Sequence, residues 1–226
     1  LTVFFSDIKD FTELTDRLEP EVLSSLLNSY LNEMSKIALK YGGTIDQFVG
    51  DAILIFFGDP ETNGEKADAT SCVLMALEMR ERMKFMRQIW EDEGISKPLN
   101  IRIGINTGYC NVGNFGSEDR LDYTIIGGEV NLASRLESNA SVGQILVSHE
   151  TYSLIKNSIT CEEREEINVK GLAHKVRTYQ VIDKKEKNEK EVTKLKDNYE
   201  GFSLSIDLGV SRKAEVIASL KNALAK

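Results

Sequence analysis

The sequence lacks any run of apolar residues close to the roughly 20 that span a bilayer, and it has no signal-peptide pattern. We therefore expect this segment to be cytoplasmic, although a longer protein containing it could be attached to a membrane. Basic residues are not in excess either. The net charge of −8 argues against nucleic-acid binding, which depends on a basic surface that neutralises phosphate. A small anionic substrate would need a bridging metal or a few well-placed cations.

Cysteine is scarce as well. The three cysteines, Cys72, Cys110 and Cys161, lie far apart and form no CxxC pair. This spacing excludes the common zinc and dithiol motifs, so we interpret them as ordinary reduced thiols. What the chain does have is 226 residues that are 41% hydrophobic and 28% charged, which is enough for one globular core with a small appendage.

Hydrophobic patterning predicts alternating strands and helices. Ile101, Ile103 and Ile105, for example, alternate with polar or small residues, as expected of a strand with one face in the core. We predict strands at 1–8, 44–49, 52–58, 100–108, 144–148, 165–171 and 176–183, and helices at 20–40, 65–93, 127–140 and 149–156. This order indicates an α+β fold, one sheet with helices on one face. Residues 1–183 form the predicted main domain, followed by a charged linker and a strand–helix extension at 184–226.

Two aspartates stand where apolar strands end. Asp7 follows the buried-type strand of Thr2–Phe5, and Asp51 lies at a tight turn between "TIDQFV" and "AILIFF". Two carboxylates at the ends of neighbouring strands can share a pair of Mg²⁺ ions about 4 Å apart, which suits displacement at phosphorus. The alternative is that each aspartate merely ends a strand or caps a turn.

Four motifs together resemble the class III nucleotidyl cyclase catalytic domain of bacterial type, the adenylyl and guanylyl cyclases. They are "FFSDIKDFT", "YGGTIDQFVGDAILIFFG", "RIGINTG" and "YTIIGGEVNLASRLES", in family order within residues 1–183. The resemblance implies a ferredoxin-like, palm-like sheet and conversion of ATP to 3′,5′-cyclic AMP and pyrophosphate. It also implies a head-to-tail homodimer with two shared sites, each using two Mg²⁺ or Mn²⁺ ions.

The resemblance also assigns roles to residues. It makes Asp7, Asp51 and the backbone carbonyl of Ile8 the metal ligands, and it lays the turn of Ile8, Lys9, Asp10, Phe11 and Thr12 against the phosphates. Arg102 and Lys170 match the triphosphate cations. Asn131 and Arg135 match the pair that orients the ribose and stabilises the transition state, and their spacing of four places them on one helix face.

Base selection departs from the family pattern. Adenylyl members usually have Lys four residues before the second metal aspartate and Asp or Thr seven before the catalytic Asn, whereas guanylyl members tend to have Glu and Cys. This sequence has Gln47 and Thr124. A Gln amide and a Thr hydroxyl can each donate or accept, so either base is chemically possible. We favour ATP over GTP because the acidic residue expected for guanine is absent.

Two alternatives remain open at this point. The chain could be a guanylyl cyclase, or a catalytically inactive cyclase-like module for dimerisation or nucleotide sensing. A diguanylate-synthesising relative would share the palm-like core, but "VGDAI" stands where its GG[DE]EF hairpin would be. We also expect an upstream sensor or regulatory domain, because the chain enters a strand directly at Leu1.

Overall fold

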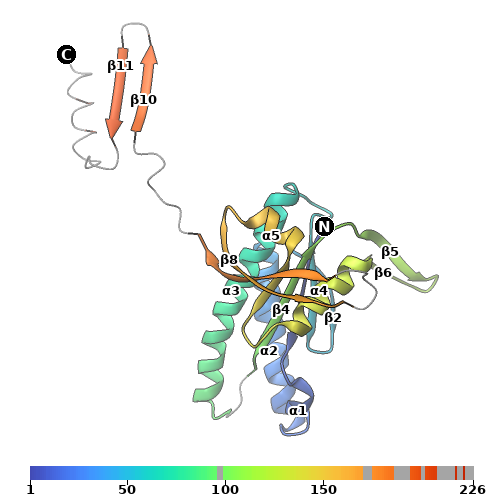
Figure 1. The fold of residues 1–226 in the computed structure, drawn as a ribbon. Helices are drawn as coiled ribbons and strands as arrows, with labels where there is room; N and C mark the ends of the chain where they lie inside the picture. The colour runs from blue at the N-terminus through green and yellow to red at the C-terminus, as the bar shows by residue number, and fades with distance from the viewer. Residues whose placement is uncertain are drawn as a thin grey trace. The chain divides into compact units, whose positions relative to one another are not determined.

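The computed structural model describes residues 1–95, 99–169, 175–185, 194–199, 202–207, 217 and 221. The chain divides into two units, Leu1–Lys185 and Glu186–Lys226. The first unit is built on a seven-stranded sheet in the order β2-β3-β1-β4-β7-β9-β8 (Figure 1). Its strands are β1 (Thr2–Ile8), β2 (Thr44–Val49), β3 (Ala52–Phe57), β4 (Ile101–Thr107), β7 (Ile145–Ser148), β8 (Ile159–Ile167) and β9 (Val176–Lys184).

The long helices begin and end where local chemistry predicts. The helices of this unit are α1 (Phe11–Thr15), α2 (Pro20–Lys40), α3 (Glu65–Asp92), α4 (Gly128–Asn139) and α5 (His149–Ile155). Helix α2 starts at Pro20, because the missing N–H of proline costs nothing in a first helical turn. It ends just before Gly42, whose φ of 80° is readily adopted only by glycine. The predicted helix at 20–40 is thereby confirmed.

Both faces of the sheet are covered. On β3, Ile53, Ile55 and Phe57 belong to the core that contains α2, α3 and α5. The alternate residues Leu54 and Phe56 instead contact a cluster that includes Ala133 of α4. The prediction that all helices lie on one face is therefore wrong for α4. Because every residue of β3 is buried, this strand needs apolar cover on both sides.

A hairpin that the sequence analysis did not predict follows β4. Strands β5 (Asn111–Ser117) and β6 (Arg120–Ile126) form a separate two-stranded antiparallel sheet. Most of their side chains are exposed, so the hairpin shows none of the alternation that marks a half-buried strand. Helix α1 was also not predicted, and β8 begins at Ile159, earlier than the expected 165.

The second unit contains a hairpin of β10 (Lys194–Tyr199) and β11 (Phe202–Asp207). Strand β11 was predicted. Strand β10 was not predicted, because it begins inside the segment that the sequence analysis assigns to the charged linker. Most of the predicted terminal helix lies outside the described residues.

Gly104 of β4 lies so close to α4 that a larger residue would not fit. A Cβ atom at this position would come within 2.2 Å of the Ala133 carbonyl oxygen and of the Glu137 backbone nitrogen. Backbone atoms cannot rotate away as a side chain would. We therefore expect Gly104→Ala to lower the free energy of unfolding by about 2–3 kcal/mol, measured by urea denaturation. Gly113→Ala in β5 is the matched control, because its nearest contact would be an ordinary 3.8 Å. An equal loss in both variants would contradict this explanation.

Candidate functional site

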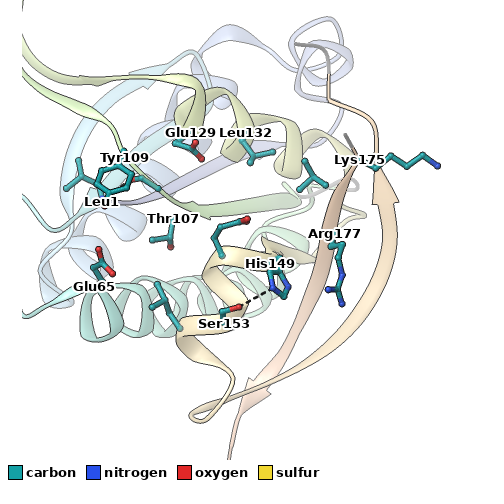
Figure 2. A pocket seen from close by; sticks show the side chains of 14 residues that line it. Leu1, Glu65, Thr107, Tyr109, Glu129, Leu132, His149, Ser153, Lys175 and Arg177 are labelled. Carbon is teal, nitrogen blue, oxygen red and sulfur yellow. Dashed lines mark hydrogen bonds between the residues drawn. The ribbon is translucent and has the colours of Figure 1, made fainter. Parts of the chain in front are cut away.

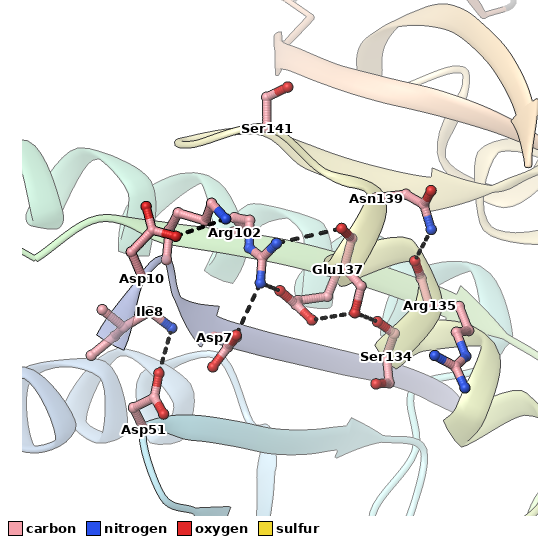
Figure 3. A network of polar contacts seen from close by, with 12 residues as sticks. Asp7, Ile8, Asp10, Asp51, Arg102, Ser134, Arg135, Glu137, Asn139 and Ser141 are labelled. Carbon is pink, nitrogen blue, oxygen red and sulfur yellow. Dashed lines mark hydrogen bonds and ion pairs between the residues drawn. The ribbon is translucent and has the colours of Figure 1, made fainter. Parts of the chain in front are cut away.

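Strand register brings Asp7 and Asp51 together. Strands β1 and β3 are antiparallel with Ser6 opposite Ile53, and continuing this register two residues further places Ile8 opposite Asp51. The backbone N–H of Ile8 donates to Oδ2 of Asp51 at 2.9 Å. Asp7 precedes Ile8 in β1, and its carboxyl group lies near that of Asp51 (Figure 3). The structure thus joins the two predicted metal ligands at one end of the sheet.

Arg102 adds a cation to this pair. It lies directly opposite Asp7 in the β1–β4 register, and its Nη2 atom is 3.0 Å from Oδ2 of Asp7. The same nitrogen is 2.9 Å from Oε1 of Glu137, a buried carboxylate on α4 (Figure 3). Its Nη1 atom also donates to the carbonyl oxygen of Ser138 at 3.4 Å. The predicted triphosphate cation therefore lies beside the predicted metal ligands.

Burial, together with neighbouring charges, raises the pKa of several groups at this site. Burial, followed by the hydrogen bond and charge of Asp7, raises the pKa of Asp51 to about 6. Burial also raises the pKa of Glu137 to about 7, against the opposing effect of Arg102. Beneath them, burial raises the pKa of Tyr30, whose hydroxyl is 3.3 Å from that of Ser6. Crowded carboxylates of this kind are a place where a bound cation would relieve repulsion.

The donor set at this site suits a hard divalent cation. Two carboxylates and a backbone carbonyl are oxygen ligands, and Mg²⁺ typically takes one or two carboxylates while water and substrate phosphates complete its octahedron. No group of three or more His, Cys, Asp or Glu side chains placed to hold a metal occurs in the part of the chain that the structure describes. Asp7, Asp51 and Ile8 thus fit a metal that is bound together with a phosphorylated substrate.

The turn after β1 leads directly into α1. Asp10 adopts a left-handed conformation with φ of 60°, and α1 begins at Phe11. The carbonyl of Asp10 accepts from the N–H groups of Glu13 and Leu14 at 3.0 and 3.3 Å. Lys9 and Asp10 form an exposed ion pair at 2.8 Å. The N–H groups of Phe11 and Thr12 are the first in the helix and have no intrahelical acceptor, as the predicted phosphate contact requires.

The two predicted base-contacting residues lie on neighbouring elements of the same chain. Gln47 is exposed on β2, and Thr124 is half-buried on β6. They are linked through Asp46, whose Oδ2 accepts from the Thr124 hydroxyl at 2.7 Å. Asp46 was not predicted, because nothing in the motif around Gln47 shows that β2 lies next to the β5–β6 hairpin.

The predicted transition-state pair lies on the outer surface of α4. Asn131 and Arg135 are both exposed, one helical turn apart. Glu137 of the same helix points toward Arg102, whereas the guanidinium of Arg135 points away from the Asp7–Arg102 cluster (Figure 3). Within one chain, Arg135 therefore does not point toward Asp7 and Asp51. Lys170, the second predicted triphosphate cation, lies outside the described residues.

A pocket of about 760 Å³ lies elsewhere, between the starts of α4 and α5 and strand β9 (Figure 2). It reaches Thr107, at the other end of β4 from Arg102, and it contains His149 with Ser153 beside it. None of the predicted site residues that the structure describes lines this pocket.

Comparison with known proteins identifies the family. The model of the adenylate and guanylate cyclase catalytic domain matches residues 1–183. The chain belongs to this family. It is 35% identical over 202 residues to the terminal-differentiation-specific adenylate cyclase of Dictyostelium discoideum, covering 87% of this chain and 9% of that protein. The chain spans between 9% and 36% of the first three curated relatives it matches.

Solved structures agree with the family assignment and the fold. The adenylyl cyclase CyaB from P. aeruginosa is 64% identical, with a TM-score of 0.79 over 80% of this chain and 93% of that one. The guanylyl cyclase Cya2 is 34% identical, with a TM-score of 0.78 over 83% of this chain and 94% of that one. The predicted cyclase-type α+β fold is confirmed. No helix among the described residues has the length and apolarity to cross a bilayer.

Proposed function

We propose that residues 1–183 are the catalytic domain of an adenylyl cyclase that converts ATP to 3′,5′-cyclic AMP and pyrophosphate. The observation that carries this proposal is the joining of Asp7 and Asp51 at adjacent strand ends, with Arg102 beside them. Members of this family use a divalent metal ion. In the proposed mechanism the 3′-oxygen attacks the α-phosphate in line while pyrophosphate leaves. Asp7, Asp51 and the Ile8 carbonyl would hold the two Mg²⁺ or Mn²⁺ ions.

The protein's own residues act by positioning and charge. When bound, the metal ions would activate the 3′-oxygen and neutralise charge on the phosphates. The Ile8 N–H fixes the orientation of the Asp51 carboxylate, and Glu137 holds Arg102 toward Asp7. From this position Arg102 can bind the triphosphate in a fork while the N–H groups at the start of α1 face the same anion.

We further propose that a head-to-tail homodimer completes each site. One copy supplies Asp7, Asp51 and Arg102, and the other supplies Gln47, Thr124, Asn131, Arg135 and Lys170. The exposed surface of α4 supports this arrangement, because Asn131 and Arg135 are free to meet a second molecule. Exposed apolar side chains on β2, β5 and β6 offer a surface for association. They are Phe48, Val49, Phe115, Leu121, Tyr123 and Ile126.

In this dimer Asn131 would orient the ribose and Arg135 would neutralise charge that grows on the α-phosphate. Catalysis of phosphoryl transfer rests mostly on positioning and electrostatics. Loss of such an arginine would cost about 10²–10³ in rate. Retention of both residues together with the aspartate pair argues against an inactive cyclase-like module.

Product identification tests the proposal. Purified protein is given ATP and then GTP, each with Mg²⁺ or Mn²⁺, and the products are identified by chromatography and mass spectrometry. Cyclic AMP as the main product is expected. Faster formation of cyclic GMP would favour the guanylyl alternative, and no product from either nucleotide would favour the inactive module.

Gln47 offers a second test, of base choice. The N1 atom of adenine accepts a hydrogen bond, whereas N1–H of guanine donates one, so a lysine at this exposed position should favour adenine. We expect Gln47→Lys to keep or raise kcat/KM for ATP and to lower it for GTP, by up to about tenfold. Gln47→Glu should do the reverse. If Gln47→Lys lost its ATP activity and kept its GTP activity, the choice of ATP would be wrong.

A further inference from the structure

We infer that Asp46 is a specificity-determining residue that fixes the hydroxyl of Thr124 as a hydrogen-bond acceptor for the adenine amino group. The inference rests on the proposed function, because it assumes that Thr124 meets the exocyclic group of the base. Asp46 would not touch the nucleotide itself. It acts by setting the direction in which the Thr124 hydroxyl can hydrogen-bond.

The direction of the Asp46–Thr124 bond follows from its partners. Oδ2 of Asp46 lies 2.7 Å from the Thr124 hydroxyl oxygen and also accepts from the backbone N–H of Ile125 at 3.3 Å. A carboxylate oxygen that accepts an N–H has no proton of its own to give. The hydroxyl proton must therefore point from Thr124 toward Asp46.

A β-bulge explains how Asp46 reaches β6. Ile45 pairs with Ile55 and Gln47 pairs with the next residue, Leu54, so Asp46 is the extra residue in β2. An extra residue of this kind has no ladder partner and its side chain is re-aimed. Here the side chain extends to β6, so the bulge brings Asp46 to Thr124 directly beside Gln47.

The consequence for base recognition is asymmetric. With its only proton committed to Asp46, the Thr124 oxygen keeps lone pairs and has no donor to offer. The adenine amino group is a donor and finds an acceptor there, whereas guanine O6 is an acceptor and meets another acceptor. The sequence alone leaves Thr124 able to serve either base, and Asp46 removes that freedom in favour of adenine.

The test compares base discrimination in matched variants of the same chain. The quantity measured is the ratio of kcat/KM for ATP to kcat/KM for GTP, with Mn²⁺ in both assays. Asp46→Ala removes the carboxylate acceptor, which frees the Thr124 hydroxyl to donate its proton to guanine. We expect the ratio to fall about tenfold, the effect of one hydrogen bond gained or lost.

Asp59→Ala is the matched control. Asp59 accepts from the hydroxyl of Tyr123, the neighbour of Thr124 on β6, so this variant makes the same chemical change one position away. We expect its discrimination ratio to stay within about twofold of wild type. An equal fall in both aspartate variants would overturn the inference, because it would show a general disturbance of the hairpin. An unchanged ratio in Asp46→Ala would overturn it directly.

Thr124 variants keep the inference testable if Asp46→Ala folds poorly, as judged by thermal melting. Thr124→Ser retains the hydroxyl and should keep the wild-type ratio. Thr124→Val removes it and should lower the ratio about tenfold. The double variant Asp46→Ala, Thr124→Val should be no worse than Thr124→Val alone, because Asp46 acts through that hydroxyl. A Thr124→Val enzyme with the wild-type ratio would overturn the inference.

Failure of the inference can be told apart from failure of the proposed function. A wild-type protein that prefers GTP, or that cyclises neither nucleotide, contradicts the adenylyl cyclase proposal and the inference with it. A wild-type protein that prefers ATP while Asp46→Ala discriminates equally well contradicts the inference alone.

Discussion

Replacement of Asp51 by alanine is expected to abolish cyclisation and leave the protein folded. The side chain lies in the turn between β2 and β3, at the end of the sheet and outside the apolar core. Its loss therefore removes no core packing. It does remove one of only two carboxylates proposed to hold the metal ions, and Asp7→Ala should have the same effect for the same reason. Activity is measured as cyclic AMP formed from ATP with saturating Mn²⁺, and folding by circular dichroism.

Two further variants test whether the loss of activity comes from the missing carboxylate charge at Asp51. Asp51→Asn retains an oxygen that can accept from the Ile8 N–H but carries no charge, so it should match wild type in thermal stability and still be inactive. Asp92→Ala changes an exposed aspartate at the end of α3 and should retain full activity. If Asp7→Ala or Asp51→Ala kept more than about a tenth of wild-type activity, a difference of about 1.4 kcal/mol, the metal assignment would be wrong.

The aspartate pair could be predicted because its cause is local. A carboxylate that interrupts an apolar strand, and another at the tip of an apolar hairpin, are visible in a few consecutive residues. What the sequence did not show is which strands pair with each other. In the structure, β1 lies between β3 and β4. Arg102 could also be predicted from a local pattern. It alternates with the isoleucines of β4, which assigns its side chain to the opposite face of that strand. Its register opposite Asp7 agrees with that assignment.

Glu137 and Asp46 could not be predicted because their roles depend on packing between distant segments. Residues 129, 133 and 137 of α4 lie over Asn106, Gly104 and Arg102 of β4, and this alignment exists only once α4 covers the second face of the sheet. The contact of Asp46 requires a one-residue bulge in β2 and a hairpin that shows no burial pattern. Short motifs carry no signal for either arrangement.

The sharing of sites between two chains makes an unusual prediction, that two inactive proteins become active when mixed. In the proposed dimer each site takes Asp51 from one chain and Arg135 from the other. A heterodimer of Asp51→Ala with Arg135→Ala therefore has one site that carries both defects and one that carries neither. With free exchange of subunits, half of the dimers are mixed, and we expect activity to return to about a quarter of the wild-type level.

The control for this experiment is a mixture of Asp51→Ala with Asp7→Ala. Both changes lie on the same side of the shared site, so every site in every dimer lacks one metal ligand, and no activity should return. Differently tagged chains purified in two steps would confirm that heterodimers have formed in both mixtures. Heterodimers of Asp51→Ala and Arg135→Ala that stay inactive would rule out the shared site. Activity that returned in the control mixture would show that Asp7 and Asp51 do not act together in one chain, because only residues on opposite sides of the interface can complement each other.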